Sequence, residues 1–259
     1  MLLLFDVGNT HVTIGGYEGD VHLFTARAES DRRKTEDEFA MLIESVLHMH
    51  GFSPADVSDG AMSSVVPVVA QALERAFELL WHKKMLNVTT DLNLGLEIMV
   101  DAPELLGKDL IVDAVGAKSQ YECPILVFDL GTATTCSVID SMGRYRGGMI
   151  APGLNISMEA LGAHTAQLPF ISIDGPARLV GRNTKDCMRS GVMYGHAGMI
   201  DGFIDRIEDE LGMKCTSVIT GGLARKVAPL CRRKLVLNDH LIFDGLRVIY
   251  ARNHARPRV

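Results

Sequence analysis

Two short stretches of the sequence place an aspartate directly before a turn of small and hydroxyl-bearing residues. "FDVGNTHVT" spans residues 5–13, and "FDLGTATT" spans residues 128–135. Glycine lets backbone N–H groups approach a ligand closely, and short hydroxyls add hydrogen-bond donors, so each turn could hold a phosphate. The aspartates could bind a hard cation through oxygen. Together these features indicate phosphoryl transfer, which needs cradled phosphate oxygens, a metal ion and an aligned nucleophile.

The recurrence of this turn is more informative than either copy alone. An alignment without gaps places Asp6 on Asp129 and Thr10 on Ala133, at an offset close to half the chain. One such turn on its own is most often an ordinary tight turn, but two copies in the same strand-turn-strand context favour a phosphate site. The chain has no P-loop pattern and no Gly-x-Gly-x-x-Gly after a strand, so these two nucleotide-binding designs are disfavoured.

The composition restricts the class of protein. The chain has 259 residues, 47% hydrophobic and 22% charged, which is enough for one large domain or two modest ones. A net charge of −6 argues against nucleic acid as a partner, and no apolar run reaches membrane-spanning length. The five cysteines are scattered without metal-site spacing, and the N-terminus reads as a buried strand. We therefore expect a cytoplasmic protein that is not associated with membranes.

The elements that must position the two turns follow the same order in both parts of the chain. Residues 2–7, 11–17 and 21–28 predict three strands, and 123–131, 134–140 and 145–151 predict three more. Thr35 and Glu38 form a capping box at the start of a helix that Gly51 ends. The repeat predicts an α/β fold of two halves, residues 1–117 and 118–259, that face one another across a cleft.

Several motifs, taken together, resemble the type III pantothenate kinases of the acetate kinase, Hsp70 and actin-like superfamily. The resemblance runs through most of the chain and depends on the order of the motifs as much as on each one. The motifs are "DVGNT" at 6–10, "KTEDEFA" at 34–40, "DLGTATT" at 129–135, "GGMIAPGL" at 147–154, "TAQLP" at 165–169, "GRNT" at 181–184 and "TGG" at 220–222.

The resemblance implies two ribonuclease H-like halves, as in actin-like ATPases, with ATP in the cleft between them. It implies a cytoplasmic homodimer that phosphorylates pantothenate with ATP, the first step of coenzyme A synthesis, using Mg²⁺ and a monovalent cation, K⁺ or NH₄⁺. The residues that would contact ATP are Asp6, Val7, Gly8, Asn9, Thr10, His11, Val12, Thr13 and Thr132. Asp129 would bind the monovalent cation, and Asp6 is a candidate for the Mg²⁺.

The acceptor side of the site is implied by a second set of residues. The family's Gly-Ala-Asp-Arg motif aligns with "GKDL" at 107–110, which makes Asp109 the matching general base. The residues that would contact pantothenate are Val100, Gly107, Lys108, Asp109, Leu110 and Thr184. From the residues alone, the favoured interpretation of Asp109 is an exposed acidic residue that stabilises the start of a helix over 111–117, and only the resemblance makes it a base.

The chain departs from the family on this acceptor side. Leu110 replaces an arginine, Asp113 an asparagine and Val100 a tyrosine. An arginine would bind a substrate carboxylate through a planar fork of donors, and Lys108 is no equivalent. Three interpretations therefore remain: a pantothenate kinase with a rearranged acceptor pocket, a kinase for another small alcohol, and a nucleotide-binding accessory or regulatory protein.

A long helix near the C-terminal end carries glycines at helical spacing, from Gly191 to Gly202. Such a small-residue seam lets another helix approach closely, either within the core or across a two-fold interface. The resemblance favours the interface. His196 on this helix is expected to be a packed, hydrogen-bonded residue rather than a ligand.

Overall fold

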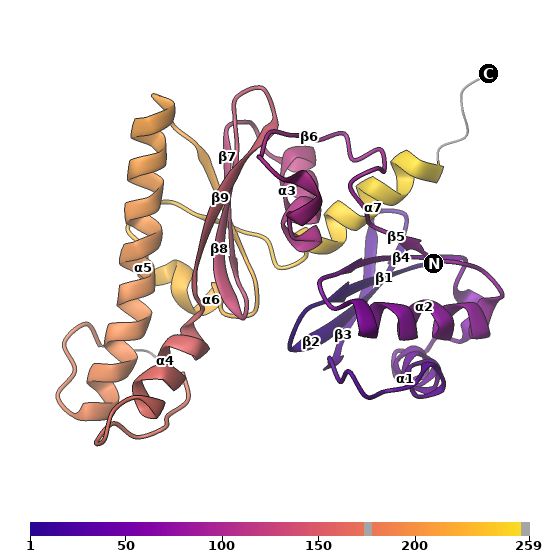
Figure 1. Ribbon diagram of the computed structural model, residues 1–259, viewed down its shortest axis with the longest axis horizontal. Helices are drawn as coiled ribbons and strands as arrows, with labels where there is room; N and C mark the ends of the chain where they lie inside the picture. Colours follow the sequence, from indigo (N-terminus) through magenta and orange to yellow (C-terminus); the bar gives the residue numbers. More distant parts are fainter. Residues whose placement is uncertain (174–177, 255–259) are drawn as a thin grey trace. The chain divides into compact units, whose positions relative to one another are not determined.

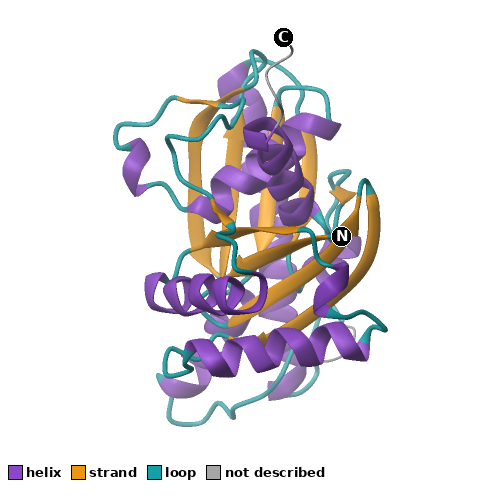
Figure 2. Ribbon diagram, turned by 90° about the vertical axis from the view of Figure 1, so that its right-hand side faces the viewer, coloured by secondary structure: helices purple, strands orange, loops and turns teal. Residues whose placement is uncertain are grey.

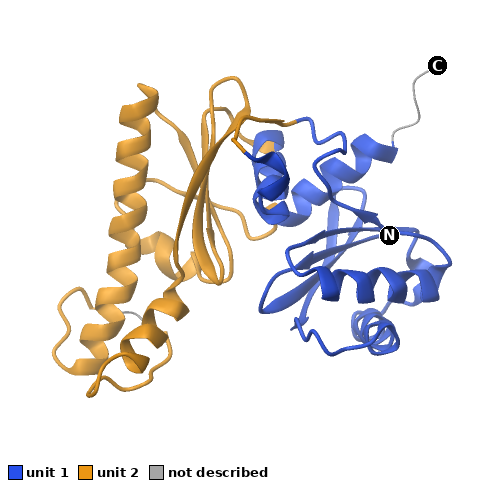
Figure 3. Ribbon diagram, in the orientation of Figure 1, with its two compact units in different colours: residues 1–95, 102–119, 242–259 blue, residues 96–101, 120–241 orange. Residues whose placement is uncertain are grey.

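The computed structural model describes residues 1–173 and 178–254. The chain divides into two compact units (Figure 3). Unit 1 contains residues 1–95, residues 102–119 and the C-terminal segment from residue 242, and unit 2 contains residues 96–101 and 120–241. The last helix is therefore grouped with the N-terminal unit, although it is distant in sequence. The division into domains at residue 117 remains a prediction.

Unit 1 is built on a mixed five-stranded sheet (Figure 1). Its strands are β1 (Leu2–Val7), β2 (His11–Glu18), β3 (Val21–Glu29), β4 (Asp59–Ser64) and β5 (Leu86–Asn87). The order across the sheet is β3-β2-β1-β4-β5. The first three strands are antiparallel neighbours, and β4 and β5 continue the sheet in parallel with β1. This is the topology expected of a ribonuclease H-like half.

The helices of unit 1 begin and end where the sequence supplies the signals. They are α1 (Glu36–Met49), α2 (Pro67–Trp81), α3 (Lys108–Gln120) and α7 (Leu241–His254), with 3₁₀ turns at Pro54–Asp56 and Pro103–Leu105. The predicted capping box of α1 is present, because the Thr35 hydroxyl accepts from the backbone N–H of Glu38 while the Glu38 carboxylate accepts from that of Thr35. At the end of α2, the Trp81 indole donates to the carbonyl of Pro54 over 2.7 Å.

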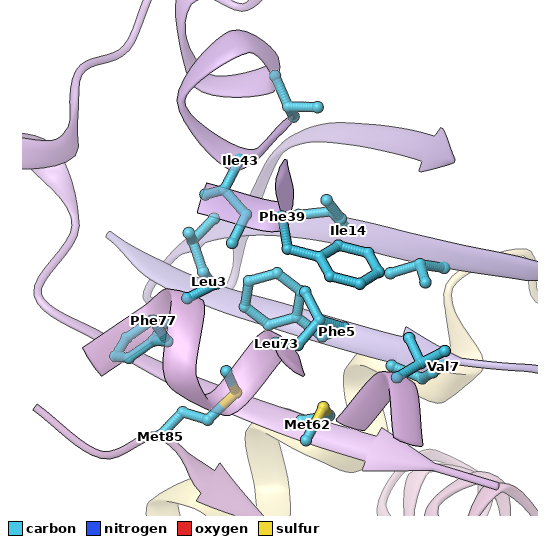
Figure 4. Packing of buried hydrophobic residues seen from close by; sticks show 14 of the residues in the cluster. Leu3, Phe5, Val7, Ile14, Phe39, Ile43, Met62, Leu73, Phe77 and Met85 are labelled. Carbon is cyan, nitrogen blue, oxygen red and sulfur yellow. The ribbon is translucent and has the colours of Figure 1, made fainter. Parts of the chain in front are cut away.

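Helices α1 and α2 cover one face of this sheet. Leu3, Phe5 and Val7 of β1 point into a core with side chains of both helices (Figure 4). Phe39 comes from α1 and Phe77 from α2, and the ring centroids of Phe5 and Phe77 lie 6.5 Å apart at right angles. Alternate residues of β1 thus anchor the strand, and Asp6 falls on the opposite face.

Helix α7 covers that opposite face. Phe243 lies against Gly15, where any β-carbon would overlap its ring, and packs beside Tyr17 with centroids 5.9 Å apart. The Tyr250 hydroxyl donates to the Asp59 carboxylate over 2.7 Å. Gly245 lies directly against the backbone of Val112 in α3. The last helix is therefore an integral layer of unit 1.

Unit 2 repeats the sheet of unit 1. Its strands are β6 (Glu97–Ile98), β7 (Ile125–Leu130), β8 (Ala133–Ile139), β9 (Arg144–Pro152), β10 (Thr216–Thr220) and β11 (Val236–Leu237). The order β9-β8-β7-β10-β11 and every strand direction match unit 1, and β6 adds a parallel strand beside β9. Figure 2 shows the strands of both sheets in orange. The predicted internal repeat is confirmed.

The helices of unit 2 are α4 (Leu154–Ala163), α5 (Thr184–Leu211) and α6 (Ala224–Val227), followed by a 3₁₀ turn at Ala228–Leu230. They pack on the face of the sheet that carries Leu126, Phe128 and Leu130. Because these residues alternate with Asp129, its side chain lies on the other face. In the part of the chain that the structure describes, no helix is long and apolar enough to cross a membrane.

A buried carboxylate fixes the end of α5. Glu208 is only 5% exposed, yet it accepts hydrogen bonds from Lys214 Nζ (2.7 Å), Arg233 Nη2 (2.6 Å) and the backbone N–H of Cys215 (3.1 Å). Burial by itself raises the pKa of this carboxyl, but the hydrogen bonds from Arg233 and Lys214 outweigh it and lower the pKa to about 2. The ion pairs therefore hold the segment before β11 against α5.

Candidate active site

The β1–β2 loop of unit 1 presents polar groups from a rigid base. Val7 and Val12 are buried on either side of it, so both strand ends are fixed in the core. The backbone N–H of Gly8 donates to the carbonyl of His11 over 2.9 Å, which closes the turn. Asn9 and Thr10 at its tip are exposed. An anion could therefore reach the side chains and backbone of this loop without unfolding the strands.

The β7–β8 loop of unit 2 is closed by the same hydrogen bond. Gly131 donates its backbone N–H to the carbonyl of Ala133 over 3.0 Å, and Thr132 at the tip is exposed. The strand register differs, however, because Asp6 is paired with Thr13 whereas Asp129 is paired with Thr135.

The second loop is therefore one residue shorter than the first. The ungapped alignment of Thr10 with Ala133 is wrong, because the hydrogen bonds equate Ala133 with His11. The equivalence of the two aspartates and of the two glycines is preserved.

Two glycines from distant segments lie against the β7–β8 loop. A β-carbon at Gly153 would overlap the carbonyl of Thr132 and lie 2.9 Å from that of Gly131. A β-carbon at Gly221 would collide with the carboxylate of Asp129 and lie 2.6 Å from the backbone nitrogen of Leu130. Gly221 also has φ +95°, which L residues rarely adopt. These glycines, which belong to the "GGMIAPGL" and "TGG" motifs, shape the loop by close approach.

Each aspartate is flanked by hydroxyl residues on both neighbouring strands. Asp6 lies between Thr13 on β2 and Ser63 on β4. Asp129 lies between Thr135 on β8 and Thr220 on β10. Register partners point to the same face of a sheet, so each carboxylate has hydroxyls on either side. The two aspartates are recognisable in the sequence, but the hydroxyls of β4 and β10 are not, because their position depends on strand pairing between distant segments.

The donor set around these aspartates suits a hard cation. Among the described residues, no group of three or more His, Cys, Asp or Glu side chains could hold a metal ion. Mg²⁺ rarely binds in a cage of protein ligands alone, and instead keeps several waters and binds one or two carboxylates together with substrate phosphates. The hydroxyls of Ser63 and Thr135 are buried and have no hydrogen-bond partner among the described residues. Oxygen donors are therefore available beside both carboxylates.

Asp109 lies in the first turn of α3. Its carboxylate is half-buried, and its Oδ1 accepts the backbone N–H of Leu110 over 2.8 Å. Burial raises the pKa of this carboxyl, against the opposing effect of that hydrogen bond. A β-carbon at Gly107 would lie only 2.5 Å from Oδ1, so the glycine leaves room for the carboxylate. A carboxylate of raised pKa is a stronger base, and this one can accept the proton of an attacking alcohol.

The other residues predicted to bind the acceptor are divided between the two units. Lys108 and Leu110 flank Asp109 in unit 1 and are half-buried. Val100 follows β6, and Thr184 is the first residue of α5, so both belong to unit 2. Thr184 is exposed and follows Asn183, which caps α5 by accepting the backbone N–H of Asp186 over 2.9 Å. Each unit thus contains one carboxylate-bearing loop and some of the residues predicted to bind the acceptor.

Helix α5 contacts the end of β9 and has one open side. The imidazole of His196 is buried, with Nε2 3.0 Å from the carbonyl oxygen of Pro152 and Nδ1 2.8 Å from that of Val192. The expectation of a hydrogen-bonded, packed histidine is confirmed. Outside the helix's own backbone, no described atom lies within 4 Å of a β-carbon placed at Gly191, Gly195 or Gly198. The seam is therefore not packed against the described part of the core.

Comparison with known proteins places these features in a family. The profile of the type III pantothenate kinases matches residues 2–206. A type III pantothenate kinase from Brevibacillus brevis is 42% identical over 255 residues, which cover 98% of this chain and 100% of the relative. One from Myxococcus xanthus is 39% identical with the same coverage.

The fold is shared more widely. The structure of a ROK hexokinase from Thermus thermophilus superimposes with a TM-score of 0.54 at 13% identity, covering 96% of this chain and 97% of the hexokinase. At that identity the likeness concerns the fold alone.

Proposed function

This chain belongs to the type III pantothenate kinase family, and from this premise we propose that it transfers the γ-phosphoryl group of ATP to pantothenate, the first step of coenzyme A synthesis. The observation that carries the proposal is the match to curated relatives over 98% of the chain and the whole of each relative. The repeated carboxylate-bearing loops support it, because each combines a closed glycine turn with exposed hydrogen-bonding groups.

Both loops serve the same ATP in this proposal. Residues 6–13 contact the nucleotide from unit 1, and Thr132 binds its phosphates from unit 2. The buried strand ends hold the loops in place, so little ordering is needed when the phosphates bind. Phosphoryl transfer depends on positioning the reacting groups and on neutralising charge. Hydrogen-bond donors that are fixed in this way therefore accelerate the transfer step.

The chemistry of the donors supports the Mg²⁺ assigned to Asp6, and the family resemblance implies the monovalent cation assigned to Asp129. Asp6 binds a hydrated Mg²⁺ that accompanies the phosphates, and Asp129 binds K⁺ or NH₄⁺. When bound, these ions neutralise phosphate charge. Gly221 supports this role by allowing the polypeptide to pass directly against the Asp129 carboxylate.

Asp109 is the general base. Its carboxylate accepts the proton of the primary alcohol of pantothenate as that oxygen attacks the γ-phosphate. Gly107 leaves space beside the carboxylate, and burial strengthens its basicity. Lys108, Leu110, Val100 and Thr184 complete the pantothenate-binding set.

Leu110 favours a second candidate activity. An apolar side chain at this position cannot form the two-pronged hydrogen bond of arginine with a carboxylate, so the preference for pantothenate is weakened. Each lost hydrogen bond to a charged group corresponds to about 1.5–3 kcal/mol, or roughly tenfold to a hundredfold in affinity. One alternative is a kinase that phosphorylates another small alcohol with the same base. The other alternative is a nucleotide-binding accessory protein without catalytic activity.

The protein acts in the cytoplasm as a homodimer in this proposal, and the open glycine side of α5 is the surface through which two copies meet. Glycines allow helix axes to approach closely, and Gly191, Gly195 and Gly198 are exposed along one side. Sedimentation velocity of the protein with Gly195→Glu tests this assignment. The variant should be monomeric at concentrations where the parent is dimeric.

One experiment separates the three activities. Purified protein is incubated with ATP, Mg²⁺ and K⁺, with and without pantothenate, and phosphorylated products are identified by mass spectrometry. Formation of 4′-phosphopantothenate is expected. Phosphorylation of other primary alcohols but not pantothenate would support the alternative kinase, and binding of ATP without any acceptor-dependent turnover would support the accessory protein.

A further inference from the structure

A buried hydroxyl lies beside Asp6 on the next strand. Ser63 of β4 is the register partner of Asp6 in the parallel β1–β4 pair. Neighbouring strands lie about 4.8 Å apart, and register partners project to the same face, so the hydroxyl and the carboxylate are adjacent. This face is opposite to the one that packs on α1 and α2, because Phe5 and its partner Met62 belong to that core.

The hydroxyl of Ser63 has no structural role that the described residues show. The residue is 0% exposed, and its Oγ has no hydrogen-bond partner among them. An unpaired buried hydroxyl is unfavourable, and the described residues supply no partner for this one. The next residue is a natural contrast, because Ser64 is also buried but accepts the backbone N–H of Val66 (3.0 Å) and donates to its carbonyl (3.2 Å).

The same arrangement recurs in the other unit. Thr135 of β8 is the register partner of Asp129, and its Oγ1 is likewise buried without a hydrogen-bond partner in the described chain. Thr135 lies on β8, which corresponds to β2 of unit 1, whereas Ser63 lies on β4. The two hydroxyls therefore lie on opposite sides of their aspartates and do not occupy equivalent strands. In both units an unpaired buried hydroxyl lies next to the carboxylate to which a cation is assigned.

We propose that Ser63 is a positioning residue whose hydroxyl hydrogen-bonds to a hydration water of the divalent cation held at Asp6. This inference rests on the proposed function, which assigns the cation to that carboxylate. Mg²⁺ gives up its waters reluctantly, and those waters are strong donors that need acceptors. A serine hydroxyl has two lone pairs to offer, and a fixed, buried one restricts where the hydrated ion can settle. Ser63 thus fixes the ion relative to the phosphates.

The test compares Ser63→Ala with Ser64→Ala. Binding of Mn²⁺ is measured by electron paramagnetic resonance in the presence of a non-hydrolysable ATP analogue, and Tm is measured without ligands. Ser63→Ala should weaken Mn²⁺ binding about threefold to tenfold, the change expected for one hydrogen bond, while Tm stays the same or rises. Ser64→Ala should leave Mn²⁺ binding unchanged and lower Tm by about 2–4 °C, because it loses bonds that the fold uses.

Different results would contradict the role of Ser63 and the assignment of the divalent cation to Asp6. Parental Mn²⁺ affinity in Ser63→Ala would overturn the inference, as would a loss of Tm equal to that of Ser64→Ala, since the hydroxyl would then support the fold. Asp6→Asn provides the reference for loss of the ion. If the parent and Asp6→Asn bind Mn²⁺ equally, the assignment of the cation to Asp6 fails, and the inference fails with it.

Discussion

Replacing Gly221 by alanine should damage both the fold and the cation site proposed at Asp129. The glycine has φ +95°, a conformation that costs an L residue about 1–2 kcal/mol. The new β-carbon would also lie 2.6 Å from the backbone nitrogen of Leu130 in the central strand β7, and would collide with the Asp129 carboxylate. Overpacking of this kind costs about 1–3 kcal/mol. The sum, about 2–5 kcal/mol, corresponds to a loss of roughly 5–15 °C in Tm.

Gly212→Ala is the matched control for this substitution. Gly212 ends α5 with φ +67°, and no neighbouring atom lies within 4 Å of a β-carbon placed there. The control therefore has the unfavourable backbone dihedral without the collision. We expect it to lose about 1–2 kcal/mol of unfolding free energy and roughly 2–6 °C in Tm. The difference in Tm between the two variants measures the contact with β7 and Asp129.

The assay pairs thermal unfolding with a titration of K⁺ in the kinase reaction. Because Asp129 must move or rotate to accommodate the new methyl group, Gly221→Ala should raise the K⁺ concentration for half-maximal rate by tenfold or more. Gly212→Ala should leave it unchanged. If Gly221→Ala loses no more Tm than the control and keeps the parental response to K⁺, the reasoning about close approach at Asp129 is refuted.

Three further substitutions test other parts of the account. Asp109→Asn should lower kcat about a hundredfold or more, while the affinity for ATP measured by calorimetry stays the same. The Tm of this variant should stay the same or rise, because burial raises the pKa of Asp109 and makes its charged form unfavourable in the fold. Turnover at the parental rate would show that Asp109 is not the base. Leu110→Arg should lower the KM for pantothenate about tenfold to a hundredfold in steady-state assays, and an unchanged KM would count against a carboxylate contact there. The Glu208 carboxylate, whose pKa is lowered to about 2, stabilises the fold above its unfolded pKa near 4.5, and this contribution is lost as the pH falls from there toward 2. Urea unfolding at pH 7 and pH 3.5 should therefore show a steeper loss in the parent than in Glu208→Gln, by about 1–2 kcal/mol, and parallel losses would show that the ion pairs contribute nothing.

Local signals predicted the features that depend on nearby residues. The capping box at Thr35 and Glu38 is local by nature, and the structure confirms it. The two aspartate-glycine turns are also local, because strand, turn and strand are consecutive, and their shared closing hydrogen bond follows. The repeat of these turns was enough to predict two α/β halves of the same design.

Features that depend on distant pairing were not predicted. The packing of Phe243 on Gly15 joins segments more than 200 residues apart, and nothing in the sequence of α7 identifies its partner. The register that places Ser63 beside Asp6 requires the order of a parallel crossover connection. The shortening of the second loop by one residue was hidden because both turns contain small polar residues that align without a visible gap.

The central claim is that the loops bearing Asp6 and Asp129 bind one ATP. A crystal structure of the protein with a non-hydrolysable ATP analogue, Mg²⁺, K⁺ and pantothenate tests it most directly. We predict that residues 6–13 and Thr132 contact the phosphates of the same nucleotide, with the pantothenate alcohol within hydrogen-bond distance of Asp109. A nucleotide bound to one loop alone, with the other aspartate remote from its phosphates, would contradict the account.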